Sequence, residues 1–297
     1  MINLFYAYQP LLDFFLLNAG FALSQYIVLR AGVFSIATVG IVSVGAYFAA
    51  IVMKNYGLSI WLVAPAAAVV GLAIGLLLSI PLARLRGPYQ AIATLAFVQI
   101  VAAIALYAEP LTGGALGMND IPKQVSTLGL LLALAIVLYI LGSLSSTRVG
   151  HIFDALRQDE AVAGSLGISI TFHHALAFAL SGAIAALFGA LQAGYIYSIE
   201  PHQYGFAMLA MTLAAVILGG RRSIWGPIVG AAIMTFLPEI ARPLAENRLL
   251  LNGLLLIVVI IFLPRGVVAG LIEVVRRRRR PAASAPVGEK ATSEVRV

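Results

Sequence analysis

The chain has no cysteine, and only 10% of its 297 residues are charged. The lack of cysteine excludes a disulfide framework and any thiolate metal site. A soluble domain of this length carries about 25% charged residues, because its surface must be hydrated. Long apolar runs without charges recur along the chain instead, as in helices that span a hydrocarbon core. We therefore exclude a soluble protein and expect a polytopic membrane protein.

The apolar runs predict an all-α transmembrane helical bundle of about nine spans, within a range of eight to ten. They lie at 10–29, 34–53, 60–80, 88–108, 126–145, 172–198, 206–219, 224–240 and 249–264. The 206–219 run is short for a span, so we expect a tilted or broken helix there. Small residues spaced four apart permit close helix crossings, namely Gly71/Gly75, Gly182/Ala186 and Gly226/Gly230.

The basic residues predict the orientation of the chain in the membrane. If the C-terminus is cytoplasmic, all but four of the 19 Lys and Arg residues lie inside, as positive-inside sorting requires. The exceptions are Lys54, Lys123, Arg242 and Arg248. We therefore expect the N-terminus outside and read the net charge of +7 as a topology signal, not as a sign of nucleic-acid binding. No Lys or Arg precedes the first run, so a retained helix is expected rather than a signal peptide.

Ionisable groups are nearly absent from the predicted spans, where only Asp13 and Glu239 lie near span ends. A proton-coupled carrier usually needs such groups near the midplane, so we disfavour one, although a sodium site made of backbone carbonyls stays open. None of the lysines, Lys54, Lys123 and Lys290, follows a glycine, which excludes a Gly-x-x-x-x-Gly-Lys phosphate loop. If transport is active, ATP hydrolysis must therefore occur on another polypeptide. We expect no metal, cofactor or catalytic centre.

The inner connection 146–171 carries its own helical pattern. Val149, Ile152, Phe153 and Leu156 are spaced i, i+3, i+4, i+7 and predict one apolar stripe. Asp159 can then cap a second short helix, with Glu160 in its first turn and Gly167 at its end. Such a structured loop suggests docking to another protein. The alternative is an interfacial helix that lies on the membrane.

The C-terminal segment differs in composition from the rest of the chain. It contains five consecutive arginines, Arg276 to Arg280, followed by Pro-Ala-Ala-Ser-Ala-Pro. We expect a disordered cytoplasmic tail over 272–297 that is attracted to anionic lipid. The transmembrane domain is accordingly predicted to cover 1–271.

Several motifs occur in the order typical of one family. They are Gly32-Val-Phe-Ser35 with Gly45-Ala-Tyr47, Leu85-Arg-Gly-Pro-Tyr-Gln-Ala-Ile-Ala-Thr-Leu-Ala-Phe97, Leu111-Thr-Gly-Gly114, Ala155-Leu-Arg-Gln-Asp-Glu-Ala-Val-Ala-Gly-Ser-Leu-Gly-Ile168, Leu218-Gly-Gly220, Trp225-Gly-Pro227 and Leu263-Pro-Arg-Gly266. Up to about residue 271, the chain resembles the LivM-type permease subunits of branched-chain amino-acid ABC importers. Three departures are Val33 and Thr38, where the family often has Gln and His, and the Arg221-Arg222 pair after Leu-Gly-Gly.

This resemblance implies a permease subunit rather than an enzyme, located in the bacterial plasma (inner) membrane. It implies as partners a second homologous permease subunit of the LivH type, two ABC ATPase subunits, a periplasmic or other extracytoplasmic solute-binding protein, and membrane lipid. Branched-chain amino acids are the expected solute, with urea or short amides as the alternative within the family. An ATP-independent channel or facilitator, or a polytopic membrane enzyme, are the alternatives from other classes.

The resemblance also points to two groups of site residues. In the family, the segment matching 155–168 is a coupling helix that sits in a cleft of the ATPase. The residues expected to couple to the ATPase are Arg157, Asp159, Glu160, Ala161, Ala163, Leu166 and Gly167. The residues expected along the translocation path are Ser35, Thr38, Gly45, Tyr47, Tyr89 and Thr94.

Overall fold

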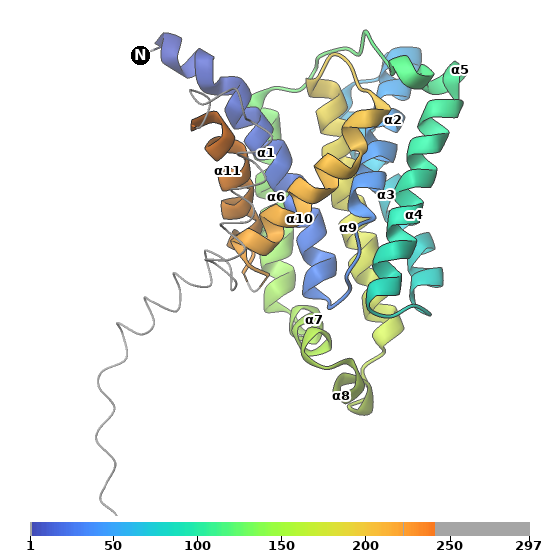
Figure 1. Ribbon diagram of the computed structural model, residues 1–297. Coiled ribbons are helices and arrows are strands. Elements are labelled where there is room, and N and C mark those ends of the chain that lie inside the picture. The colour runs from blue at the N-terminus through green and yellow to red at the C-terminus, as the bar shows by residue number, and fades with distance from the viewer. Residues whose placement is uncertain (1, 222, 241–297) are drawn as a thin grey trace, which may run out of the picture.

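The computed structural model of the protein describes residues 2–221 and 223–240 (Figure 1). Helices account for all the regular elements of these residues, as predicted. They are α1 (Ile2–Arg30), α2 (Thr38–Tyr56), α3 (Ile60–Leu82), α4 (Pro88–Tyr107), α5 (Glu109–Thr112), α6 (Thr127–Ser146), α7 (Arg148–Gln158), α8 (Glu160–Ser165), α9 (Ile170–Tyr195), α10 (Phe206–Gly219) and α11 (Trp225–Ile240), with short 3₁₀ turns at Gly114–Leu116 and Pro201–Tyr204.

Seven segments within the described residues are long and apolar enough to cross a membrane. They are Tyr8–Arg30, Thr38–Tyr56, Ile60–Leu82, Pro88–Tyr107, Thr127–Ser146, Ile170–Tyr195 and Pro201–Gly219. The polytopic helical bundle is thus confirmed, whereas the count of nine and the sidedness of the termini stay predictions. The eighth run forms the shorter α11, and the ninth run, 249–264, lies outside the described residues, as does the 272–297 tail. Figure 1 shows α10, on the short 206–219 run, lying obliquely across the bundle.

The spanning helices divide into a buried centre and an exposed periphery. Within their most apolar windows, 72% of α1, 67% of α2 and 72% of α9 are buried, against 33% of α3, 28% of α4 and 33% of α6. The peripheral helices therefore turn large apolar side chains outward, such as Leu77, Ile80 and Ile136. An outward apolar surface of this kind is stable in lipid and would aggregate in water.

Small residues bring the central helices close together. A Cβ on Gly71 of α3 would lie 2.2 Å from the carbonyl oxygen of Gly182 in α9, and one on Gly75 would lie 2.2 Å from that of Phe178. A Cβ on Gly45 of α2 would likewise lie 2.4 Å from the Ala186 oxygen. The predicted close crossings through Gly71, Gly75 and Gly182 are therefore confirmed, and α9 packs against both neighbours backbone to backbone.

The two ends of the bundle carry different charges. Successive spans alternate in direction, so the end of α1, the α3–α4 turn and the end of α10 lie on the same side as α7 and α8 (Figure 1). All the arginines of the described residues lie on this side, and Lys54 and Lys123 lie on the other. The described residues therefore show the charge sorting on which the predicted orientation rests.

Candidate functional site

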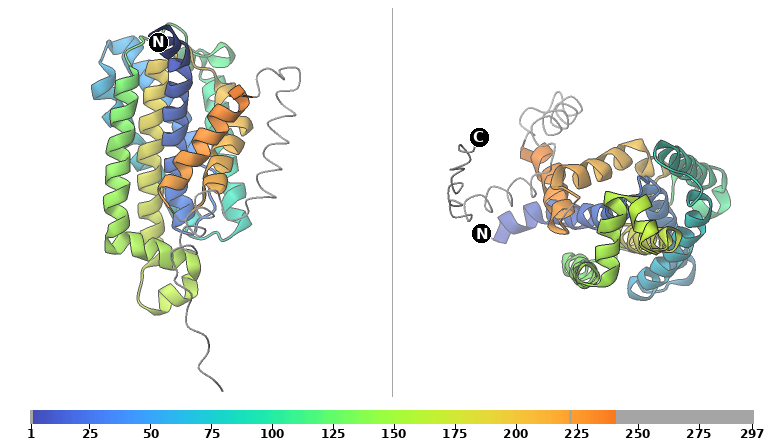
Figure 2. Two further views of the ribbon diagram at one scale, coloured as in Figure 1. Left: turned by 90° about the vertical axis from the view of Figure 1, so that its left-hand side faces the viewer. Right: turned by 90° about the horizontal axis from the view of Figure 1, so that it is seen from below.

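The most prominent feature at the arginine-rich end is the pair α7 and α8, which projects beyond the spanning helices (Figures 1 and 2). The predicted stripe explains how α7 attaches to the bundle. Phe153 and Leu156 are fully buried, while Val149 and Ile152 are half-buried at the edge of the same face. The apolar stripe therefore faces the protein's own core.

The short helix α8 begins and ends at the predicted residues. The Asp159 carboxylate accepts hydrogen bonds from the backbone N–H of Ala161 (2.8 Å) and of Val162 (3.1 Å), which are otherwise unpaired donors at a helix start. Gly167 has a φ of +83°, a left-handed conformation that glycine adopts without a steric penalty. The N–H of Ile168 then donates to the Ala163 oxygen at 3.2 Å. These local signals were sufficient to predict the helix.

The predicted coupling residues fall into an outward and an inward group. Ala161 and Leu166 point outward, and Leu166 is 75% exposed. Ala163 is buried, and Arg157 and Glu160 are half-buried next to partners in the same chain. The prediction did not single out Val162, which is 56% exposed and, with Ala161 and Leu166, forms what we call the α8 tip.

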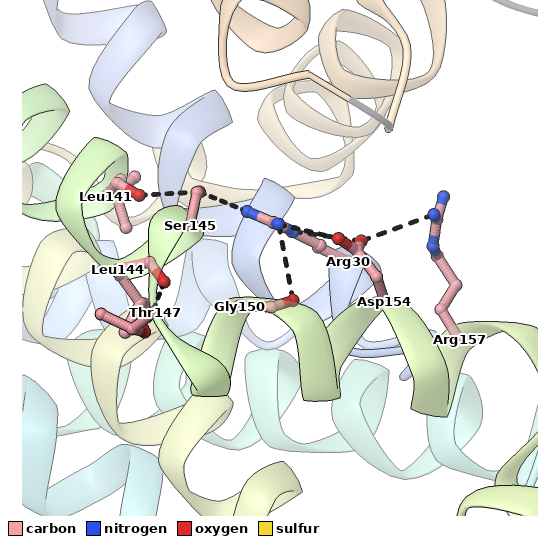
Figure 3. Close-up of polar contacts among 8 residues, drawn as sticks. All are labelled: Arg30, Leu141, Leu144, Ser145, Thr147, Gly150, Asp154 and Arg157. Atoms are coloured by element: carbon pink, nitrogen blue, oxygen red, sulfur yellow. Dashed lines mark hydrogen bonds and ion pairs between the residues drawn. The ribbon is translucent and has the colours of Figure 1, made fainter.

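Arg30, at the last position of α1, holds α7 against the bundle (Figure 3). Its guanidinium donates to the Asp154 carboxylate at 2.9 and 3.3 Å, to the Gly150 carbonyl oxygen at 3.5 Å, and to the Ser145 hydroxyl. Arg157 lies 3.5 Å from the same carboxylate. One side chain thereby joins α1 to both α6 and α7 through charge-assisted hydrogen bonds.

Sequence reasoning missed this contact. It counted Arg30 only as a topology charge and gave Asp154 no role. The available signal was an acidic residue three positions before Arg157, on a helix whose other face is apolar. That signal cannot identify Arg30, which is 124 residues away along the chain.

Three of the predicted path residues lie together, in a buried polar cluster at the same end of the bundle. The Thr38 hydroxyl donates to the Gln25 side-chain oxygen at 2.5 Å, and the Gln25 amide donates to the Ser35 carbonyl oxygen at 2.5 Å. The Ile36 N–H donates to the Thr94 hydroxyl at 3.1 Å. Ser35, Thr38 and Thr94 are each at most 3% exposed, so this cluster ties the ends of α1, α2 and α4 together.

The other three predicted path residues are dispersed. Gly45 lies at the α2–α9 crossing described above. Tyr47 is buried on α2, with its ring centroid 6.3 Å from that of Tyr204, whereas Tyr89 is 69% exposed at the start of α4. Among residues 2–221 and 223–240, no group of three or more His, Asp or Glu residues could hold a metal ion.

Comparison with known proteins adds to this geometry. Residues 12–264 match the family described as branched-chain amino acid transport system / permease component. The chain is 32% identical over 284 residues to the high-affinity branched-chain amino acid transport system permease protein LivM of Salmonella typhimurium, covering 84% of this chain and 65% of that protein. It is 31% identical over 309 residues to LivM of Escherichia coli K12, covering 93% and 70% respectively.

The chain is also similar, over a shorter region, to a second permease protein of the high-affinity branched-chain amino acid transport system. The chain is 29% identical over 123 residues to the permease protein LivH of Escherichia coli K12, covering 41% of this chain and 40% of that protein. The chain matches no solved structure. It spans less than two-thirds of the Salmonella relative's length, since the match covers 65% of that protein.

Proposed function

Because this chain belongs to the permease family of branched-chain amino acid transport systems, we propose that it forms half of the translocation path of an ABC importer and is driven by separate ATPase subunits. It is a multi-pass protein of the inner membrane, and its relatives are transport subunits rather than enzymes. The importer moves a small polar solute, and the names of the LivM relatives favour branched-chain amino acids.

The observation that carries the proposal is the α8 tip. Val162 and Leu166 are exposed apolar side chains on a capped helix, at the end of the bundle where the arginines gather. Positive-inside sorting supports a cytoplasmic location for that end, where ATP is available. A short apolar projection on a rigid base suits a cleft in a partner protein. The proposed contacts come from the α8 tip, with Asp159 and Gly167 fixing its shape.

The other proposed partners follow from the similarity to known permeases. Similarity to LivH as well as to LivM supports pairing with a second, homologous permease subunit. Two ATPases on the cytoplasmic side and an extracytoplasmic solute-binding protein complete the proposed importer. We propose a permease domain over 1–271 and a basic cytoplasmic tail over 272–297. We propose that the translocation path lies next to Ser35, Thr38 and Thr94, whose hydrogen bonds with Gln25 and with the Ile36 N–H would have to rearrange during transport.

Substitution of Leu166 by Asp tests the docking role of the α8 tip. A charge at the centre of an apolar contact should weaken ATPase binding by about 2 kcal/mol, roughly thirtyfold. The measurement is co-purification of the ATPase subunits with the permease pair from detergent-solubilised membranes. Leu116→Asp is the matched control, because Leu116 is 83% exposed but lies at the opposite end of the bundle. Equal ATPase recovery with both variants would contradict the docking role.

A further inference from the structure

The α7–α8 element has a second contact with the bundle beside the Arg30 cluster. The turn that leaves α1 packs directly against the last turn of α7. A Cβ on Gly32 would lie 3.1 Å from the Arg157 Cα and 3.4 Å from the Leu156 carbonyl oxygen. The φ of Gly32 is +89°, so glycine is favoured by both the conformation and the lack of space. The middle and the end of α7 therefore both contact the end of α1.

The ion pair at the first contact is suited to transmitting movement. The Arg30 side chain is 11% exposed and that of Asp154 is 34% exposed, so water screens the pair less than it would a surface pair. Two N–H groups of the Arg30 guanidinium donate to separate oxygens of the Asp154 carboxylate. This forked geometry fixes orientation as well as distance. Gly150 lets the start of α7 pack against the last turn of α6, since a Cβ there would lie 2.6 Å from the Leu144 carbonyl oxygen. A displacement of α7 would therefore pull on α1 directly.

The contact continues into the buried polar cluster. Gln25 lies on α1 itself, five residues before Arg30, and its amide and oxygen hold Ser35 and Thr38. Thr94 ties the same turn to α4 through the Ile36 N–H. Contiguous hydrogen bonds between packed elements therefore connect the α1 end to the starts of α2 and α4.

We infer that Arg30 is a positioning residue that makes α1, and through it the Gln25–Ser35–Thr38–Thr94 cluster, move with α7 when the ATPase moves the α8 tip. This inference rests on the proposed function, because it needs an ATPase bound at α8. It assigns Arg30 a task that is separate from docking, since Arg30 does not belong to the α8 tip. Loss of Arg30 should leave the ATPase bound but disconnect its cycle from the transmembrane helices.

The test uses the complete importer reconstituted in liposomes with radiolabelled leucine as the probe. The variants are Arg30→Gln, Asp154→Asn, the double variant and Arg30→Lys. The readouts are ATPase co-purification, ATP hydrolysis and leucine taken up per ATP hydrolysed. We expect Arg30→Gln to keep the ATPase bound and to lower uptake per ATP roughly tenfold. The double variant should be no worse than Arg30→Gln, because both changes remove one interaction.

The conservative and control variants separate positioning from general stability. Arg30→Lys keeps the charge but loses the fork, so it should restore part of the uptake per ATP. Arg84→Gln removes an exposed arginine from the α3–α4 turn on the same side and should behave as wild type. Asp154→Asn changes the more exposed partner of the ion pair. It should also lower uptake per ATP, and so it tests the positioning role even if Arg30→Gln fails to accumulate.

The outcomes distinguish this inference from the proposed function. Wild-type uptake per ATP in folded Arg30→Gln or Asp154→Asn would overturn the positioning role and leave the proposed function standing. Failure of both variants to accumulate would also overturn it, because Arg30 would then act in folding alone. If the unaltered chain did not bind an ATPase, the proposed function itself would fail.

Discussion

Gly167→Arg is expected to abolish both leucine transport and co-purification of the ATPase subunits, while the variant still inserts in the membrane. A non-glycine residue at a φ of +83° costs about 1–2 kcal/mol in backbone strain. The capping hydrogen bond from Ile168 to Ala163 depends on this turn. The variant also places a long charged side chain next to Leu166 in the proposed contact. The effect should therefore fall on docking and not on the bundle.

Gly57→Arg is the matched control for this experiment. Gly57 also has a left-handed φ, +62°, and a Cβ at either glycine would meet nothing within 4 Å. Gly57 ends α2 at the opposite side of the bundle, away from the proposed ATPase contact. We expect normal ATPase recovery with Gly57→Arg and none with Gly167→Arg. Normal recovery with Gly167→Arg would rule out the docking role of α8.

Gly182→Val is expected to prevent accumulation of the folded protein. Its Cβ would lie 2.2 Å from the carbonyl oxygen of Gly71, which belongs to a helix backbone and cannot rotate away. Overpacking of this kind costs about 3 kcal/mol or more, because α3 and α9 would have to separate along their whole crossing. The measurement is the amount of monodisperse protein in detergent, with its melting temperature.

Gly142→Val provides the control, because Gly142 is also in a membrane helix, α6, but is exposed and has no atom within 4 Å of its Cβ position. The same substitution should leave yield and melting temperature close to those of the unaltered chain. Similar losses for Gly142→Val and Gly182→Val would mean that valine itself is poorly tolerated in these helices. The close α3–α9 crossing would then not explain the role of Gly182.

The parts of the structure that were predictable from sequence are those with local causes. The Asp159 cap, the α7 stripe and the Gly167 turn each depend on residues within one or two helical turns. The helix ends were less predictable. The apolar run at 34–53 suggested a helix start near 34, but α2 begins at Thr38. The preceding turn is held by Gln25 and Thr94, which no local pattern connects to it.

The contacts that join distant segments were beyond the reach of a single sequence. Arg30 and Asp154 are each ordinary charges in their own neighbourhoods, and only the packing of α7 under α1 brings them together. Family resemblance pointed to Ser35, Thr38 and Thr94 as residues of the translocation path, which stays a prediction, and the structure joins them in one buried cluster. The resemblance also selected Tyr89, which lies exposed and apart from them, because motif membership does not specify which way a side chain faces.

Reconstitution in liposomes distinguishes an ATP-driven importer subunit from a self-sufficient channel. Liposomes would contain either the purified chain alone or the complete importer, with leucine and the binding protein on one side and ATP on the other. We expect leucine to accumulate only with the complete importer and only when ATP is hydrolysed. Leucine passage through the chain alone, at the same rate without ATP, would show a self-sufficient channel or facilitator and would rule out an ATP-driven importer subunit.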